Sequence, residues 1–182
     1  PDRIYLKVTQ TASNSRKGKR TAKRSDKIKQ ALKALDADAA TDLGAAKLLR
    51  ELGMFDTLRD QILSGLPVLA TCAGMILLAD HIEGDPTVHF QTMPVTVRRN
   101  AYGRQLGSFH TVHDLKGLGE IPMTFIRAPY ISQAADDVEV LAAVDGHIVA
   151  VRCKNQTALA FHPELDESDA LHQQFLAQCK NA

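Results

Sequence analysis

The 182-residue sequence predicts an α/β fold, with a mainly parallel sheet and an antiparallel extension. In the first half, segments with helical periodicity alternate with short apolar runs, which is the pattern of strands joined by helices. In the second half, short strand-like runs follow one another, and Asp145-Gly146 is a hairpin turn signal between two of them. Chains of about 100–200 residues usually form one domain, so we expect residues 1–182 to form a single domain.

The first elements follow from side-chain periodicity. Ile4, Leu6 and Val8 alternate with polar or larger residues and predict a short strand. Apolar residues recur at helical spacing within residues 28–35, and again in two stripes within 44–63 that Gly53 interrupts. Residues 67–71 form an apolar run typical of a buried parallel strand, and residues 73–82 predict an apolar helix that begins immediately after it.

The second half is dominated by strand signals and ends in a helix. Alternating or β-branched runs predict strands at residues 95–98, 124–127, 138–144, 147–152 and 158–161. The apolar residues within 166–179 keep helical spacing and predict a closing helix.

Composition excludes several classes of protein. Hydrophobic residues make up 45% and no apolar run reaches the roughly 18–20 residues that span a bilayer, so we expect a globular protein with no membrane partner. The first residues carry no basic segment followed by an apolar one, so we expect no secretory signal. Three scattered cysteines form neither a disulfide framework nor a zinc pattern, which favours the reducing cytoplasm.

The net charge of +1 conceals an uneven distribution. Residues 1–35 hold 11 Lys and Arg against two Asp, whereas the rest of the chain is acidic. Basic residues within 16–33 could attract nucleic-acid phosphates. No aromatic side chain is interleaved there, and a Lys-rich helix face is usually only solvated, so nucleic-acid binding is the least favoured of the functions considered.

Cys72 is the first candidate catalytic residue. It lies between the predicted strand 67–71 and the apolar helix, at a corner flanked by the small residues Ala70, Ala73 and Gly74. Such a corner exposes the sulfur, places it near the positive end of a helix and leaves backbone N–H groups free for an oxyanion. The alternative is a buried structural cysteine, because free cysteines are among the most buried residues.

His162 and Glu164 could complete a catalytic triad. They follow the predicted strand 158–161, and in extended backbone geometry residues two apart point to the same side. The carboxyl ends of parallel strands meet at one sheet edge, so His162 should lie near Cys72. The order Cys, His and Glu then suits amide hydrolysis, with His162 as base and Glu164 as its orienting acceptor.

The other histidines carry weaker signals. His110 and His113 are three residues apart in a strand-like segment and therefore on opposite faces, so we expect no metal site there. We expect surface or helix-end positions for the remaining four, which are His81, His89, His147 and His172.

Four segments together resemble the SNO (PdxT) family of class I glutamine amidotransferases: residues 65–79 around Cys72, 97–105, 125–129 and 161–165. The resemblance implies a flavodoxin-like three-layer α/β/α fold. It also implies a glutaminase subunit that hydrolyses L-glutamine to glutamate and ammonia with Cys72, His162 and Glu164. Arg99, Ile126 and Arg127 match the family's glutamine contacts. The implied partner is the synthase subunit (PdxS type) that uses the ammonia to make pyridoxal 5′-phosphate, and no cofactor or metal is implied.

The first 46 residues fit the family poorly. Where the family carries a glycine-rich loop that contacts glutamine and the oxyanion, this chain has residues 38–43 without glycine. Removing one oxyanion donor typically lowers turnover by about 10²–10³. The alternative to an active glutaminase is therefore a catalytically impaired, glutaminase-like binding partner of the synthase.

Overall fold

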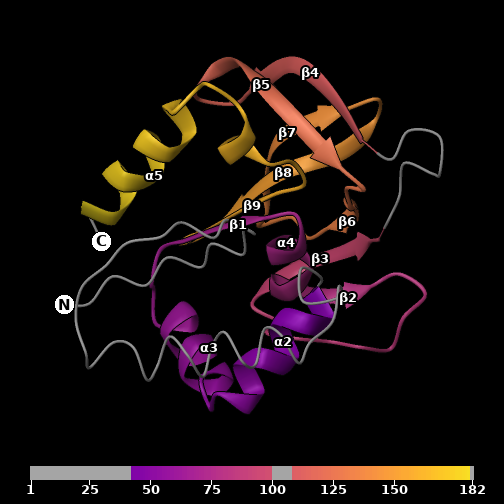
Figure 1. The fold of residues 1–182 in the computed structure, drawn as a ribbon, viewed down its shortest axis with the longest axis vertical. Coiled ribbons are helices and arrows are strands. Elements are labelled where there is room, and N and C mark those ends of the chain that lie inside the picture. Colours follow the sequence, from indigo (N-terminus) through magenta and orange to yellow (C-terminus); the bar gives the residue numbers. More distant parts are fainter. Residues whose placement is uncertain (1–41, 100–107, 181–182) are drawn as a thin grey trace, which may run out of the picture.

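The computed structural model describes residues 42–99 and 108–180 (Figure 1). The expected strand at 4–8, the helix at 28–35, the basic segment 16–33 and most of the loop at 38–43 lie outside the described residues. Within the described part, the α/β class is confirmed.

The predicted pair of helices is confirmed. Helix α2 spans Asp42–Glu51 and α3 spans Phe55–Leu63, with Gly53 between them at a φ of 66° that favours glycine. Strand β1, Val68–Thr71, and the short helix α4, Ala73–Leu78, then form the expected strand-to-helix corner.

One seven-stranded, curled sheet holds most of the remaining chain (Figure 1). Its strands are β1, β2 (Ala79–Ile82), β3 (Met93–Arg98), β6 (Tyr130–Ala134), β7 (Glu139–Val144), β8 (His147–Cys153) and β9 (Gln156–Leu159). The order is β1-β9-β8-β6-β3-β2, with β7 paired to β8. Only β1–β9 and β2–β3 are parallel, so the expected majority of parallel pairs is wrong for the described residues. Short hairpin connections, including Asp145-Gly146, force antiparallel pairing.

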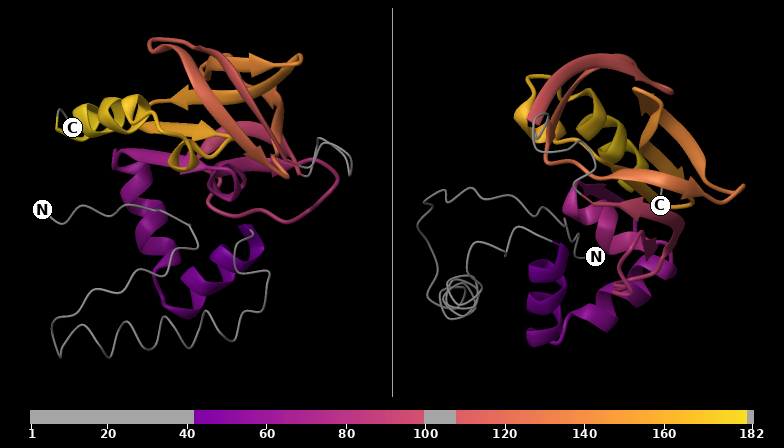
Figure 2. Two further views of the ribbon diagram at one scale, coloured as in Figure 1. Left: turned by 45° about the horizontal axis from the view of Figure 1, so that its top comes forward. Right: turned by 90° about the vertical axis from the view of Figure 1, so that its right-hand side faces the viewer.

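A separate two-stranded hairpin and a closing helix complete the chain. Strands β4, Ser108–Leu115, and β5, Gly119–Ile126, pair with each other, and α5 spans Ala170–Lys180 after the short 3₁₀ turn η2, Pro163–Leu165. Figure 2 shows α2 and α3 on one side of the sheet, and α5 with the β4–β5 hairpin on the other.

Several predicted elements differ from the structure: the strand expected at 124–127 begins earlier, at Gly119, and the closing helix begins later, at Ala170. The helix expected at residues 73–82 ends at Leu78, because Ala79–Ile82 pairs with β3 as strand β2. The strand expected at 158–161 lies earlier, at Gln156–Leu159, where it pairs with β1 and β8. These last two segments are continuously apolar or nearly so, and such runs do not distinguish strand from helix by periodicity.

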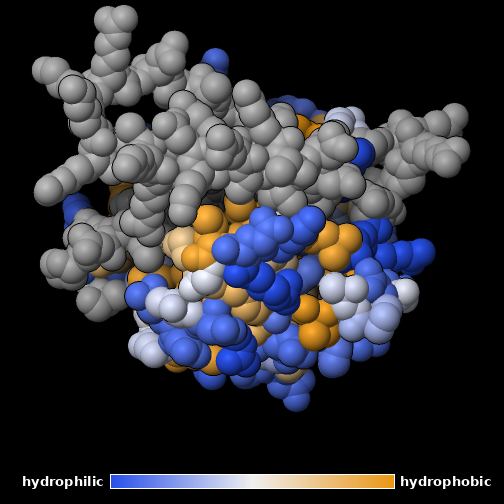
Figure 3. All heavy atoms as spheres, turned by 60° about the horizontal axis from the view of Figure 1, so that its bottom comes forward, coloured by the Kyte–Doolittle hydropathy of each residue, from blue (hydrophilic) through white to orange (hydrophobic). Residues whose placement is uncertain are grey.

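The core packs against the sheet, and its largest fully buried side chains include Phe90, Phe125, Phe161, Met75 and Leu77. Figure 3 shows the face formed near α2 and α3, where hydrophilic side chains alternate with separate hydrophobic ones. Among the described residues, no helix combines the length and apolar character required to cross a bilayer.

Candidate active site

Cys72 occupies the sharp corner between β1 and α4. Its φ of 48° and ψ of −105° lie outside the regions that L residues normally adopt. Strained backbone of this kind persists where the surrounding structure fixes it, and it is common at active sites. Here the fixing contact is the hydrogen bond from the Cys72 N–H to the Leu159 carbonyl, at 2.7 Å, which joins the corner to the end of β9.

Small residues are required around this corner. A Cβ atom added to Gly74 would lie 3.1 Å from the Cβ of Ala70, which is tighter than ordinary side-chain contacts. The corner therefore has little room for a side chain at position 74. Cys72 itself is partly exposed, unlike the buried Cys153, so the alternative of a buried structural cysteine does not apply to it.

His162 and Glu164 lie at the same sheet edge as Cys72. His162 Nδ1 lies 3.1 Å from Glu164 Oε1, and their side chains are 18% and 9% exposed. The Cys72 side chain is the other group that interacts with the His162 ring. The backbone differs from our expectation, because Glu164 lies in the 3₁₀ turn η2 and not in extended chain. Pro163 at the first position of the turn favours this geometry.

The two partners change the protonation of His162. Its hydrogen bond with the Cys72 side chain, and next that with the Glu164 carboxylate, raise the pKa of His162 to about 9. Burial opposes this shift and is outweighed. An imidazolium beside a sulfur stabilises negative charge on that sulfur when it forms, which is the arrangement that a cysteine nucleophile needs.

Ile126 ends β5 and Arg127 follows it, and the same strand contacts the backbone of His162. The His162 N–H donates to the Thr124 carbonyl at 2.8 Å, two residues before Ile126. Both side chains are exposed, and Arg127 has a φ of 44° just after the strand ends. Among the described residues, the Arg127 guanidinium forms no ion pair.

Arg99 is held by two carboxylates. Its Nη2 atom pairs with Asp42 at the start of α2, and its Nη1 atom pairs with Asp85 in the loop between β2 and β3. Asp42 also binds His89 Nε2 at 2.9 Å, and the His89 side chain is 1% exposed. The expectation that His89 lies at the surface is wrong, because Asp42 provides a buried partner that periodicity does not reveal. None of these contacts joins Arg99 to Cys72 or His162.

This buried cluster is expected to stabilise the fold. Burial raises the pKa of Asp42, but the His89 hydrogen bond and the Arg99 ion pair lower it by more, so the net shift is downward from 3.8. Removing one member of a buried ion pair leaves uncompensated charge and costs about 3 kcal/mol. We therefore expect Asp42→Ala to lower the free energy of unfolding by about 3 kcal/mol in urea titrations at neutral pH.

The pH dependence of the free energy of unfolding provides a control for the Asp42→Ala prediction. The stability that ionised Asp42 contributes is present above its unfolded-state pKa and is lost as pH falls through the lower folded-state value. The difference between wild type and Asp42→Ala should therefore shrink in acid. The exposed Asp136→Asn should change little at either pH. An Asp42→Ala protein as stable as wild type at neutral pH would contradict the assignment.

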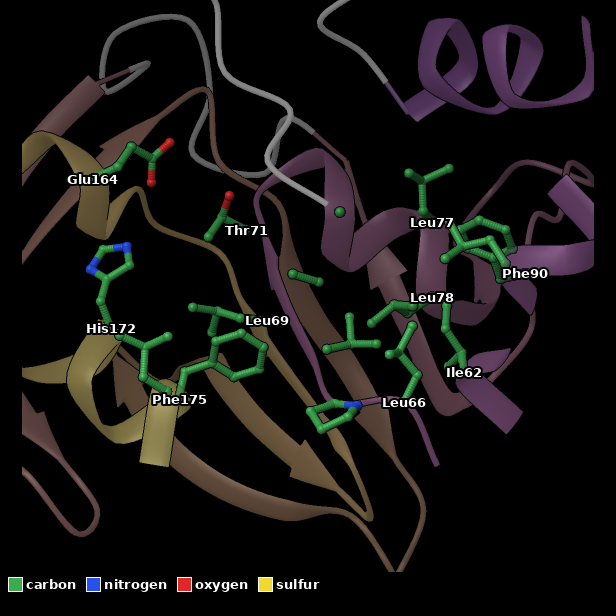
Figure 4. A pocket seen from close by; sticks show the side chains of 16 residues that line it. Ile62, Leu66, Leu69, Thr71, Leu77, Leu78, Phe90, Glu164, His172 and Phe175 are labelled. Carbon is green, nitrogen blue, oxygen red and sulfur yellow. The ribbon is translucent and has the colours of Figure 1, made fainter. Parts of the chain in front are cut away.

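An apolar cavity of about 260 Å³ lies beside the site, along β1 (Figure 4). Glu164 and Thr71 lie toward one end, whereas Leu66 and Phe90 lie toward the other, and Phe175 of α5 faces Leu69. Cys72 and His162 do not line it. Its hydrocarbon walls suit apolar side chains and not an amide or a charged amino acid.

Comparisons with known proteins place the chain in a family. The sequence matches the SNO glutamine amidotransferase family over residues 8–181. A protein of Desulfitobacterium hafniense (strain DSM 10664 / DCB-2), named pyridoxal 5′-phosphate synthase subunit PdxT, is 61% identical over 130 residues, which cover 71% of this chain. A protein of the same name from Streptococcus pneumoniae (strain CGSP14) is 53% identical over 146 residues, covering 80% of this chain and 74% of its own.

Structural similarity agrees with the sequence match. A crystal structure titled as a glutamine amidotransferase superposes with a TM-score of 0.73 at 38% identity, covering 76% of this chain and 75% of that one. The chain spans 65% of the length of the Desulfitobacterium relatives that it matches.

Proposed function

This chain belongs to the SNO glutamine amidotransferase family, and from that premise we propose that it is a glutaminase that supplies ammonia to a pyridoxal 5′-phosphate synthase. The observation that carries the proposal is the contact of His162 with both Cys72 and Glu164 at one sheet edge. The relatives named as synthase subunits supply the substrate and the partner of the proposal.

The proposed reaction has two stages. Cys72 Sγ attacks the side-chain amide carbon of L-glutamine, and His162 donates its proton to the amide nitrogen. The C–N bond breaks, ammonia leaves and a glutamyl thioester with Cys72 remains. Water then attacks the thioester while His162 accepts its proton, and glutamate is released. Glu164 holds the His162 ring through Nδ1 in both stages.

The backbone at the start of α4 is the first candidate for stabilising the oxyanion. The Ala73 N–H follows the proposed nucleophile and has no partner four residues earlier within the helix. The backbone donors of hydrolases with a nucleophile at such a corner include this position. We propose Ala73 N–H as one donor; the family's glycine loop corresponds to residues 38–43, mostly outside the described residues.

Glutamine binding is assigned to Arg99, Ile126 and Arg127. Arg127 has an exposed side chain and follows β5, whose Thr124 carbonyl accepts the His162 N–H, and a guanidinium suits the α-carboxylate of glutamine. The Nη atoms of Arg99 already bind Asp42 and Asp85, so Arg99 reaches a substrate through these atoms only if it shares or opens one of those ion pairs. We therefore assign the larger part of carboxylate binding to Arg127.

Arg127→Ala is expected to raise the KM for glutamine about tenfold or more, because a charge-assisted hydrogen bond is lost. The value of kcat should change less, since the carboxylate lies away from the reacting amide. Arg98→Ala is the matched control, because Arg98 contacts Glu83 and Tyr130 and lies at the end of β3. Steady-state ammonia release measures both variants, and an unchanged KM in Arg127→Ala would remove this contact.

The proposed function is tested by mixing this chain with a PdxS-type synthase subunit and measuring ammonia released from L-glutamine. We expect release from glutamine and none above background from asparagine, whose amide lies one methylene closer to the backbone. If the chain binds the synthase but releases no ammonia, the function is instead that of a catalytically impaired, glutaminase-like binding partner.

Two finer proposals accompany this function. We propose a flavodoxin-like three-layer arrangement, supported by helices on both sides of the sheet (Figure 2). We also propose a cytoplasmic location, supported by the three free cysteines of the described residues, which suit a reducing compartment. No cofactor enters the proposed reaction.

A further inference from the structure

Two hydrogen bonds with Thr124 attach the segment that carries Glu164 to β5. At the start of the turn, the His162 N–H donates to the Thr124 carbonyl at 2.8 Å. At its end, the Thr124 hydroxyl donates to Asp166 Oδ1 at 2.7 Å. The main chain and the side chain of one strand residue therefore hold both ends of the segment 162–166.

The burial of Asp166 indicates that this attachment is specific. Its side chain is only 4% exposed, and its Oδ2 atom is buried with no hydrogen-bond partner among the described residues. A buried carboxylate with one unsatisfied oxygen is unfavourable by itself. The bond from Thr124 is the contact that offsets part of that cost, together with His110, whose Nδ1 lies 3.0 Å from Thr124 Oγ1 and 3.4 Å from Asp166 Oδ1.

The strand β5 presents Thr124 in a fixed direction. Met123 and Phe125 on either side are fully buried, and alternation along the strand turns Thr124 to the opposite face, beside its cross-strand partner His110. Phe125 also packs against the ring of Phe161 with centroids 5.7 Å apart, just before His162. Strand β5 is thus packed against the segment that leads from β9 to His162.

We propose that Thr124 and Asp166 are positioning residues that set the contact between Glu164 and His162. The proposal rests on the proposed glutaminase function for its effect on turnover. The groups that face His162 are Glu164 from the turn and Cys72 from the corner. Asp166 and His110 instead contact the hydroxyl of Thr124. If the bond to Thr124 is removed, Glu164 is no longer held at a fixed distance from His162 Nδ1. The imidazole is then less well oriented, and its charged form is less stabilised.

Paired substitutions test the hydroxyl and the carboxyl separately. Thr124→Val removes the hydroxyl at nearly constant shape, whereas Thr124→Ser retains it. With the synthase subunit present, we expect Thr124→Val to lower kcat about 10- to 100-fold with little change in KM, because small displacements of catalytic groups have effects of this size. Thr124→Ser should remain near wild type, as should Thr111→Val, which removes a hydroxyl from the neighbouring strand.

A second readout needs no glutamine. NMR titration of the histidine ring protons in the full chain, assigned with His162→Asn, follows the midpoint of His162 itself. We expect Thr124→Val to lower that midpoint by about one pH unit, since a weakened hydrogen bond to the charged form lowers a histidine pKa. A purely structural role would change thermal stability without changing this midpoint.

The outcomes separate this proposal from the proposed function. Suppose that Thr124→Val lowers the His162 midpoint but the wild-type chain releases no ammonia with the synthase. This result would support the positioning role and reject the glutaminase. Folded Thr124→Val with an unchanged midpoint would overturn the positioning role, and so would an equal loss in Thr124→Ser. If Thr124→Val does not fold, Asp166→Leu replaces it, with Asp166→Asn as the variant that keeps the acceptor.

Discussion

Cys72→Ala is expected to reduce ammonia release from glutamine by at least about 10⁴-fold, because removing the member that forms the covalent bond disables the whole triad. The structure gives the reason for so large an effect. Cys72 is the partly exposed sulfur at the strained corner, and His162 contacts it directly. The buried Cys153, in contrast, has a thiol whose pKa is raised by burial and then by Asp137.

The measurement is ammonia release with the synthase subunit present, and Cys179→Ala is the matched control. Cys179 is also partly exposed, but it lies on α5 and contributes to no part of the proposed site. Its variant should keep wild-type turnover. The two variants together separate loss of the nucleophile from a general effect of removing a reduced thiol.

Labelling provides an independent result for the same residue. A glutamine-like electrophile should modify Cys72 and leave the buried Cys153 unmodified, as peptide mass spectrometry would show. Equal ammonia release by wild type and Cys72→Ala would remove the triad assignment. A wild type that is labelled at Cys72 but turns over very slowly would point to a deficient oxyanion site and not to a missing nucleophile.

The corner at Cys72 could be predicted from sequence because its determinants are local. A short apolar run, a cysteine and small neighbours specify a strand, a sharp turn and a helix within a few residues. The proximity of His162 followed from one general rule, that parallel strands end at the same sheet edge. Strands β1 and β9 are one of the two parallel pairs in the described residues, so the rule applied where it was needed.

The buried cluster around Asp42 could not be predicted in this way. Asp42, Asp85 and Arg99 belong to three segments that no periodicity connects, and the resemblance to the family assigned Arg99 to the substrate. A charge pattern in one dimension does not say which opposite charges meet. Only the tertiary fold brings Asp42 at the start of α2 to Arg99 just after β3, and it also buries His89.

The contact between Glu164 and His162 also depends on a residue that is distant in sequence. We expected extended chain, in which residues two positions apart such as His162 and Glu164 point to the same side, but Pro163 begins a 3₁₀ turn. The contact survives because Thr124, some 40 positions earlier, holds the turn in place. Strand β6 was also not predicted, since Tyr130–Ala134 carries no strong alternation of apolar residues.

Glu164→Gln is expected to reduce kcat by about 10²- to 10⁴-fold while leaving the fold intact, because an amide can present its N–H₂ group to Nδ1 and favour the wrong ring tautomer. Glu167→Gln is the matched control, since Glu167 is exposed just beyond the turn. Steady-state kinetics with the synthase subunit measure both variants. Turnover unchanged in Glu164→Gln would mean that another group orients His162.

The same substitution has a predicted pH signature with a definite sign. The Cys72 contact and then Glu164 raise the pKa of His162 from 6.5 to about 9, so removing the carboxylate charge should lower the midpoint toward 6.5. A raised histidine pKa contributes stability that is full below the unfolded-state value and lost as pH rises through the folded-state value. Wild type should therefore exceed Glu164→Gln in unfolding free energy near pH 6.5, and this difference should vanish above about pH 9. A difference that grows with pH across this window would show that Glu164 stabilises the protein through a contact other than His162.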